Sequence, residues 1–234
     1  MENSDYLKNL NENQLEAVKT INGPVMVFAG AGTGKTRTLI SRIVYMIKEC
    51  NIQPYNILAI TFTKKATNEM RERLEKQIDD NAKFVHISTI HSLCANILRR
   101  NATYLDYGRN FEVIDEEDQV KILNEIYKKS EINRRVLSPK VAIKAIGDFK
   151  NKSCLELVGL LKTVYNEYQT FLKENNMMDF EDLLVLTYKL FKENPNILEY
   201  YQNEFKYILV YKIPMLFSMI LLICCVKNMK IFLL

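Results

Sequence analysis

A short apolar run that breaks into a glycine-rich loop is the feature that most constrains the fold of this chain. Residues 25–28 read Val-Met-Val-Phe, and residues 29–36 read Ala-Gly-Ala-Gly-Thr-Gly-Lys-Thr. Apolar residues then recur at the spacing of an amphipathic helix between positions 39 and 47. A buried strand, a glycine-rich turn and a helix in this order predict an α/β fold with the loop at the carboxyl end of a parallel strand.

The loop fits the P-loop pattern, with alanine at the position of the first glycine, where a small residue still permits the tight turn. Gly32 and Gly34 let successive backbone N–H groups point at phosphate oxygens beside a helix N-terminus. Lys35 is expected to reach the β- and γ-phosphates of ATP, and the Thr36 hydroxyl to hold Mg2+. We therefore predict catalytic roles for Lys35 and Thr36, with Thr36 as the metal ligand, and a nucleotide site made of Ala29, Gly30, Ala31, Gly32, Thr33, Gly34, Lys35, Thr36 and Arg37. The alternative is a glycine-rich turn without a phosphate role, and the flanking strand and helix disfavour it.

The composition is that of a soluble globular protein and leaves its partners open. The chain has 234 residues, of which 48% are apolar and 26% charged. Its net charge of +4 permits a nucleic-acid partner without requiring one. The five cysteines are odd in number and lack metal-ligand spacing, which suits reduced thiols and predicts no zinc site. The N-terminus is polar and has no apolar segment typical of a secretory signal, so we expect a cytoplasmic protein.

Strand and helix patterns alternate along most of the chain, which predicts a parallel sheet with crossover helices. From about residue 115 to residue 176 the pattern is helical, with polar breaks near Ser130–Asn133, Ser138–Pro139 and Gly147–Asp148. We interpret this stretch as a helical insertion in the sheet domain. The predicted strands are residues 25–28, 57–61, 84–88 and 207–210, and the predicted helices are residues 14–20, 66–77, 90–100, 180–191 and 197–203.

Three more segments carry a resemblance to a known family. Residues 10–14 read Leu-Asn-Glu-Asn-Gln, residues 60–71 begin Ile-Thr-Phe-Thr-Lys-Lys, and residues 88–98 begin Ser-Thr-Ile-His-Ser. Together with the P-loop, and in the same order, they resemble the Q-motif and motifs Ia and Ib of superfamily 1 DNA helicases of the UvrD, PcrA and Rep group. The resemblance implies a RecA-like sheet and an adenine-reading role for Gln14. Without it, Gln14 would be an ordinary polar residue in a first helical turn.

The motif Ia and Ib segments imply contacts with single-stranded DNA. Thr61 and Thr63 can donate to phosphates, and Phe62 offers a face on which any base can stack. His91 and Ser92 are the further DNA-contact candidates. Two alternatives stay open, because periodicity alone also permits Phe62 in the core and His91 as a capping or surface residue. Metal binding by His91 is not expected, since no carboxylate completes a site.

The resemblance also implies a subdomain plan. It assigns residues 1–102 to the first part of a RecA-like ATP-binding domain, termed 1A, residues 103–177 to an all-helical 1B-like insertion, and residues 178–210 to a return to domain 1A. Asp179 and Asp182 could form a catalytic carboxylate pair, but acidic residues in a first helical turn are usually caps, and we interpret them so.

The resemblance stops at Val210. The family continues there with Asp-Glu-x-Gln-Asp, whose acidic pair holds Mg2+ through water and polarises the attacking water, whereas this chain continues Tyr-Lys-Ile-Pro. We therefore expect nucleotide binding with very slow hydrolysis. Residues 211–234 are interpreted as an aberrant apolar tail, produced by a frameshift near residue 210. A neighbouring reading frame can encode Gln-Asp-Thr-Asn, the sequence that the family has after its acidic pair. Because the resemblance ends at Val210, we expect an incomplete sheet with an uncovered edge there.

Two functions remain open. The first is the N-terminal part of an ATP-dependent helicase that moves 3′ to 5′ on single-stranded DNA and unwinds duplex DNA, with repair or replication proteins as partners. The alternative is a non-hydrolysing module that binds nucleotide or single-stranded DNA and is attached to a membrane through its tail. The apolar run at residues 213–226 is too short to span a membrane. We expect the tail to lower solubility, so that removing residues 211–234 raises it.

Overall fold

The structure is a computed structural model that describes residues 5–28, 30, 32–151, 156–211 and 231–233. The chain divides into two compact units, which are described separately. The first, here termed the sheet unit, comprises Met1–Ser92 and Asn194–Leu234. The second, termed the helical unit, comprises Leu93–Glu193.

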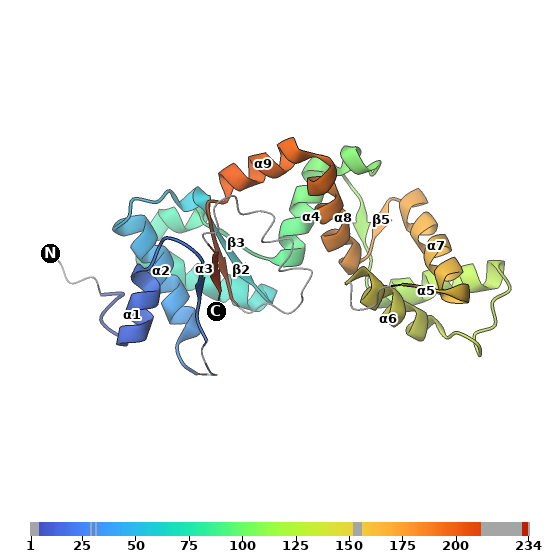
Figure 1. The fold of residues 1–234 in the computed structure, drawn as a ribbon, viewed down its shortest axis with the longest axis horizontal. Coiled ribbons are helices and arrows are strands. Elements are labelled where there is room, and N and C mark those ends of the chain that lie inside the picture. The colour runs from blue at the N-terminus through green and yellow to red at the C-terminus, as the bar shows by residue number, and fades with distance from the viewer. Residues whose placement is uncertain (1–4, 29, 31, 152–155, 212–230, 234) are drawn as a thin grey trace. The chain divides into compact units, whose positions relative to one another are not determined.

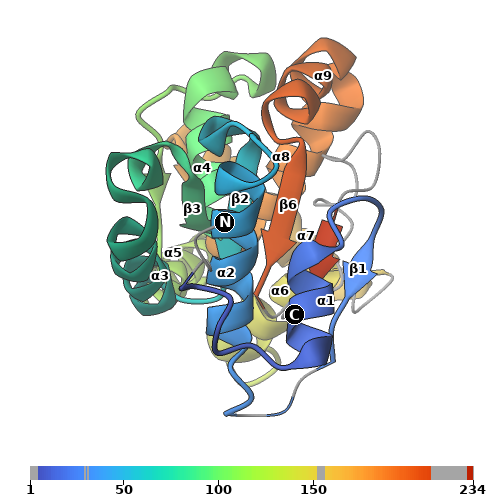
Figure 2. The same cartoon turned by 90° about the vertical axis from the view of Figure 1, so that its left-hand side faces the viewer.

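A parallel sheet forms the centre of the sheet unit (Figures 1 and 2). Its strand order is β1-β7-β6-β2-β3, and every adjacent pair is parallel. The strands are β1 (Val25–Met26), β2 (Ile57–Thr61), β3 (His86–Thr89), β6 (Tyr207–Val210) and β7 (Ile231–Leu233). All residues of β2 are buried, as expected for an inner strand of a sheet that is covered on both faces.

The helices of the sheet unit follow the chain's capping signals. The first helix begins with a capping box, in which the Asn11 side chain accepts from the Gln14 N–H and the Gln14 side chain accepts from the Asn11 N–H. The Thr63 hydroxyl caps a later helix by accepting from the Ala66 N–H. The helices are α1 (Glu12–Lys19), α2 (Lys35–Lys48), α3 (Lys64–Ile78) and α9 (Pro195–Glu204), with 3-10 turns at Pro54–Asn56 and Asp79–Phe84.

Helices α2 and α3 pack on the sheet and bury the main apolar core of this unit. Leu39 and Ile43 of α2 and Leu74 of α3 are fully buried in that core. Leu209 of β6 and Phe232 of β7 belong to the same cluster. The core therefore joins the helix that follows the glycine-rich loop to strands from the far end of the sequence.

The helical unit has its own core. Most of α4 (Ile90–Asn101) belongs to the helical unit, although its first residues belong to the sheet unit. Buried residues of α5, α6 and α7, such as Leu123, Ala142 and Val164, form one cluster. The remaining elements are a 3-10 turn at Ala102–Leu105, α5 (Glu116–Lys129), α6 (Pro139–Lys150), α7 (Gly159–Glu174), α8 (Phe180–Glu193) and a parallel pair of short strands, β4 (Glu112–Val113) and β5 (Met177–Met178).

Most predicted elements are present, and the exceptions are confined to short segments. Strands 57–61 and 207–210 have the predicted bounds. The predicted polar break at Gly147–Asp148 is wrong, because both residues lie inside α6. The insertion also contains the small β4-β5 sheet, which the all-helical prediction lacks.

The prediction of an uncovered edge at Val210 is wrong as well. Strand β6 pairs with β2 on one side and with β7 on the other, with Val210 opposite Leu233. Strand β7 comes from within residues 211–234, the segment predicted to be an aberrant tail. Most of that segment, residues 212–230, lies outside the described residues. The two compact units meet after Ser92 and after Glu193, which differs from the predicted subdomain limits at residues 102 and 178. Those limits stay a prediction.

Candidate functional site: a nucleotide-binding loop and the neighbouring strand ends

The glycine-rich loop connects β1 to the N-terminus of α2. Gly32 and Gly34 have φ angles of 78° and 77°, in the left-handed region that favours glycine. Gly34 is the N-cap of α2 and has no side chain that could cap the helix. The first turn of α2 also has no acidic residue. Its backbone N–H groups and the positive end of its dipole thus favour an anion.

Two side chains of the loop converge on one carbonyl oxygen. Lys35 Nζ donates to the Gly30 oxygen at 2.6 Å, and Thr33 Oγ1 donates to the same oxygen at 2.7 Å. The lysine ammonium therefore lies against the loop, where P-loops bind phosphates. Thr36 is half-buried in the first turn of α2. Ala29 and Ala31, the other predicted members of the loop, lie outside the described residues.

Gln14 joins the start of α1 to the loop. Its Nε2 donates to the Thr33 oxygen at 2.8 Å, and its Oε1 accepts from the Asn11 N–H at 3.0 Å. The side-chain amide still has one N–H and one acceptor lone pair beyond these two bonds. The structure thus places Gln14 beside the loop, and its reading of adenine stays a prediction.

Arg37 lies on the first turn of α2 and points towards the N-terminal segment. Its Nη1 donates to the Asn9 oxygen at 3.3 Å. The side chain lines a cavity of about 340 Å³ between the N-terminal segment, α2 and α3. The other lining residues are Asp5, Tyr6, Asn9, Ile40, Ser41, Arg73, Lys76 and Gln77.

Metal ligands are scarce around the loop. Within the described residues, no group of three or more His, Cys, Asp or Glu side chains could hold a metal ion. At the carboxyl end of β6, where the resemblance implies an acidic pair, the chain has Tyr211, whose N–H donates to the Ile60 oxygen at 2.8 Å. Thr36 is the one Mg2+ ligand that the sequence predicts, and this role stays a prediction.

At the end of β2 the Phe62 ring is exposed, whereas the hydroxyls of Thr61 and Thr63 form hydrogen bonds within the protein. Phe62 is 55% exposed, so the alternative that it is a core residue is wrong. Thr61 is buried, and its hydroxyl lies 2.6 Å from that of Thr67. The Thr63 hydroxyl caps α3 by accepting from the Ala66 N–H at 3.1 Å. The Phe62 ring is thus accessible at this strand end, whereas Thr61 is not.

The end of β3 lies beside the end of β2, since Thr61 pairs in register with Thr89. The Ser92 N–H donates to Thr89 Oγ1 at 3.2 Å, and that hydroxyl donates to Ser92 Oγ at 2.9 Å. His91 is half-buried, and burial lowers the pKa of its imidazole, which is therefore neutral at pH 7. The structure thus brings the predicted motif Ia and Ib residues together at one edge of the sheet.

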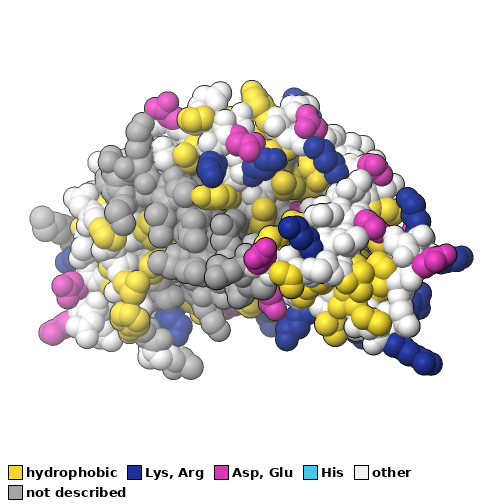
Figure 3. Space-filling view, turned by 45° about the vertical axis from the view of Figure 1, so that its right-hand side comes forward, with side chains coloured by type: hydrophobic (Ala, Val, Ile, Leu, Met, Phe, Trp, Pro, Cys, Tyr) yellow, Lys and Arg dark blue, Asp and Glu magenta, His cyan; other side chains and the backbone are white. Residues whose placement is uncertain are grey.

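Figure 3 shows that Lys and Arg side chains are interspersed with Asp and Glu on the visible face of the helical unit. This mixed surface suits the chain's modest net charge of +4. The DNA prediction therefore rests on the motif residues at the strand ends rather than on a basic stripe on this face.

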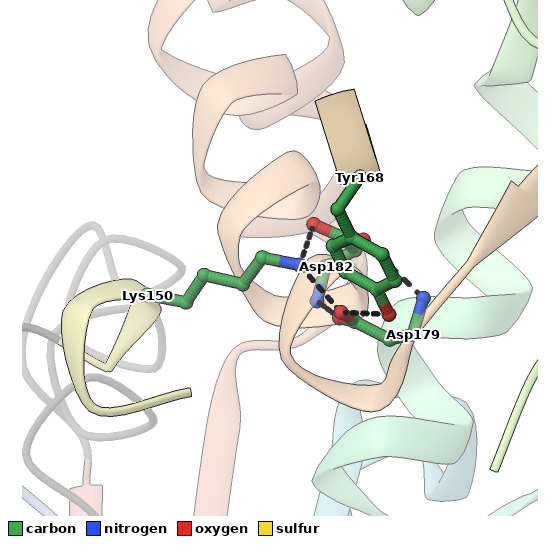
Figure 4. Close-up of polar contacts among 4 residues, drawn as sticks. All are labelled: Lys150, Tyr168, Asp179 and Asp182. Atoms are coloured by element: carbon green, nitrogen blue, oxygen red, sulfur yellow. Dashed lines mark hydrogen bonds and ion pairs between the residues drawn. The ribbon is translucent and has the colours of Figure 1, made fainter. Parts of the chain in front are cut away.

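Asp179 and Asp182 cap α8, as predicted, and also form a buried ion cluster that the sequence did not indicate (Figure 4). The Asp182 N–H donates to Asp179 Oδ1 at 2.8 Å, and the Asp179 N–H donates to Asp182 Oδ2 at 3.3 Å. Lys150 Nζ lies 2.5 Å from Asp179 Oδ2 and 2.8 Å from Asp182 Oδ1. The Tyr168 hydroxyl donates to Asp179 Oδ2 at 3.1 Å.

Burial and charge act against each other in this cluster. Burial raises the pKa of Asp182 to about 6, against the lowering influence of Lys150. Burial lowers the pKa of Lys150, but the two carboxylates outweigh it, so the pKa of the ammonium is raised. The cluster joins α6, α7 and α8 of the helical unit, which indicates a structural role.

Comparison with known proteins agrees with this arrangement. The family model described as the UvrD/REP helicase N-terminal domain matches residues 10–211. The ATP-dependent DNA helicase PcrA of Staphylococcus aureus is 43% identical over 212 residues, which cover 86% of this chain and 29% of that protein. PcrA of Staphylococcus epidermidis is 42% identical over the same shares. The chain thus spans less than a third of the length of these relatives. From the match over residues 10–211, we conclude that the chain belongs to the UvrD/REP helicase family.

Proposed function

We propose that this chain binds ATP with Mg2+ at the glycine-rich loop and represents the N-terminal part of an ATP-dependent DNA helicase. The observation that carries the proposal is the loop itself. Lys35 Nζ lies on the Gly30 oxygen, beside two left-handed glycines and a helix N-terminus without acidic residues in its first turn. The ammonium can move from the carbonyl to a phosphate oxygen, while the N–H groups at the start of α2 bind the phosphates.

Three further residues at or beside the loop have separate proposed roles. Thr36 is the proposed Mg2+ ligand, and the bound ion would neutralise charge on the phosphates. Gln14 is the proposed adenine reader, supported by its bond to the Thr33 oxygen. Arg37 is proposed to lie beside the bound nucleotide.

The proposed DNA partner binds at the neighbouring strand ends. Phe62 would stack on a base, while Thr63, His91 and Ser92 would bind phosphates, so that single-stranded DNA is held without regard to sequence. Thr61 is buried and bonded to Thr67, so we propose that it shapes this edge. Duplex unwinding, 3′ to 5′ movement and a role in repair or replication belong to the proposal for the whole protein.

The second candidate function is a non-hydrolysing module that binds nucleotide and single-stranded DNA. Tyr211 favours it, because a phenol at the end of β6 can neither hold a hydrated Mg2+ nor polarise water as a carboxylate does. Within the described residues no helix is long and apolar enough to cross a membrane, and most of the tail lies outside them.

The proposed site is tested by titrating the purified chain with the fluorescent ATP analogue mant-ATP in the presence of Mg2+. Lys35→Ala should weaken binding by about tenfold or more, since 1.4 kcal/mol corresponds to one factor of ten. Lys83→Ala is the matched control, because Lys83 is an exposed lysine of the sheet unit that pairs with Asp80. Unchanged affinity in Lys35→Ala would rule out the loop as the site.

Both candidate functions share the expectation that this chain hydrolyses ATP very slowly. Steady-state release of phosphate from ATP, measured with and without oligothymidine, tests that expectation. We expect no stimulation by the oligonucleotide. Stimulated hydrolysis would show that this chain is an active ATPase despite Tyr211.

A further inference from the structure

Strand β7 is the one described strand that hydrogen-bonds to β1, the strand that leads into the glycine-rich loop. Val25 pairs with Phe232 and Met26 with Leu233. The ladder continues one residue towards the loop, where the Val27 N–H donates to the Leu233 oxygen at 2.8 Å. On its other side β7 pairs with β6, with Ile208 opposite Ile231. Figure 2 shows β7, in dark red, between β1 and β6.

Phe232 also contacts the helix that follows the loop. Its side chain is 1% exposed and belongs to the core cluster beneath α2. The Arg42 guanidinium of α2 lies 4.3 Å from the centre of the Phe232 ring. The same guanidinium donates to the Ala17 oxygen of α1 at 2.5 Å. One side chain of β7 thus packs against α2, while its backbone pairs with β1.

These contacts matter because β1 is short. A two-residue strand has few ladder bonds, and those described for β1 are made with β7. Without β7, β1 and β6 would both lose their shared neighbour, and the space that Phe232 fills beneath Arg42 would be empty. The strand before the loop and the helix after it would then lose the partner that they share.

We propose that β7 positions the nucleotide-binding loop, with Phe232 as the positioning residue, so that ATP binding depends on Ile231–Leu233. This proposal rests on the proposed function of the loop. It also reverses the expectation for the tail, because removing residues 211–234 removes a buried strand of the sheet. That truncation should lower both stability and solubility.

The experiment uses the full chain and compares Phe232→Asp with Phe232→Leu, each titrated with mant-ATP and Mg2+. Phe232→Asp places a charge in the core and should weaken binding about tenfold or more, whereas Phe232→Leu keeps an apolar side chain and should stay within about threefold of the unmodified chain. The matched control is Phe84→Asp, which changes a phenylalanine of the same unit that is 59% exposed.

Amide hydrogen exchange separates positioning from general unfolding. In Phe232→Asp, protection should fall in residues 25–28 and in α2, and stay unchanged in β2 and β3. Equal loss of protection in β2 and β3 would mean that Phe232 only stabilises the whole unit, which overturns the proposal. Unchanged mant-ATP affinity in a folded Phe232→Asp chain overturns it as well.

A second measurement needs no variant and applies if Phe232→Asp does not fold. Saturating mant-ATP should slow amide exchange in Ile231–Leu233 of the unmodified chain, because the loop and β7 are coupled. Unchanged exchange there contradicts the coupling. If the unmodified chain binds no mant-ATP, the proposed function fails. Whether β7 positions the loop is then decided by amide hydrogen exchange alone: protection must fall in residues 25–28 of Phe232→Leu or Phe232→Asp.

Discussion

Lys35 Nζ donates to the carbonyl oxygen of Gly30 at 2.6 Å, so the loop's cation is held by the loop's own backbone. A bound phosphate would have to replace this bond with one to a charged oxygen, which is the stronger partner. The exchange requires the backbone to keep its curl while the ammonium moves. The left-handed glycines of the loop are therefore the first positions at which the proposal can be tested.

Gly34→Ala should destabilise the loop and weaken mant-ATP binding. A side chain at the φ of 77° that Gly34 adopts is strained by about 1–2 kcal/mol. The added Cβ would also lie 3.3 Å from Gln14 Nε2, which bonds to the loop. Urea unfolding and mant-ATP titration measure the two effects.

Gly30→Ala is the control within the same loop. Its φ is not in the left-handed region, and the nearest atom to its added Cβ is Thr33 Cγ2 at an ordinary 3.7 Å. We expect this variant to unfold at the same urea concentration as the unmodified chain. Equal losses of stability in the two variants would contradict the strain argument.

Much of the sheet unit was predictable from the sequence because its determinants are local. Strand β2 is a continuous apolar run, as buried parallel strands are, and its predicted and observed bounds agree. The loop was predictable because phosphate binding demands glycines and lysine at fixed spacing. The caps Asn11 and Thr63 likewise act within three residues of their own positions.

The failures involve contacts between distant residues. Nothing in a three-residue apolar segment shows that Ile231–Leu233 inserts between β1 and β6 rather than remaining an apolar tail. Lys150 likewise ends an ordinary amphipathic helix, and its partners Asp179 and Asp182 are recognisable only once α6 and α8 are in place. Gly147 predicted a break, but glycine inside a helix costs only about 1 kcal/mol relative to alanine, and the packing of α6 outweighs it.

Phe62→Ala should weaken binding of single-stranded DNA while leaving the fold intact. The ring is 55% exposed, so its removal leaves no cavity. Loss of one stacked base costs about 1–3 kcal/mol of binding free energy. The measurement is fluorescence anisotropy of labelled oligothymidine, with Phe84→Ala, at 59% exposed, as the matched control. If both variants bind oligothymidine as the unmodified chain does, Phe62 is not a stacking residue.

Lys150→Met should destabilise the helical unit strongly. Removing the ammonium leaves two buried carboxylates without their shared cation, and breaking a buried pair in this way costs about 3–5 kcal/mol. Lys144→Met is the control, because Lys144 is an exposed lysine on the same helix. Thermal unfolding measures both variants. A melting temperature of Lys150→Met close to that of Lys144→Met would show that the cluster does not hold α6 and α8 together.

Asp182→Asn should flatten the dependence of stability on pH between about 4 and 6. Burial raises the pKa of Asp182 from its ordinary 3.8 to about 6, and the titratable groups that interact with it are Lys150, Asp179, Tyr107, Tyr165 and Tyr168. Within this range the folded chain still holds a proton that the unfolded chain has released. This carboxyl's contribution to stability is therefore fully present below about pH 3.8 and is lost as pH rises through about 6.

Urea unfolding of the unmodified chain and of Asp182→Asn at intervals across this pH range measures the effect. Asparagine keeps one oxygen, which can accept from the Asp179 N–H as Oδ2 does, so the cap should survive, while an amide nitrogen replaces the Oδ1 that contacts Lys150. The unmodified chain should lose stability relative to the variant as the pH rises. A constant difference between the two would mean that Asp182 is ionised throughout this range and that Lys150 outweighs burial.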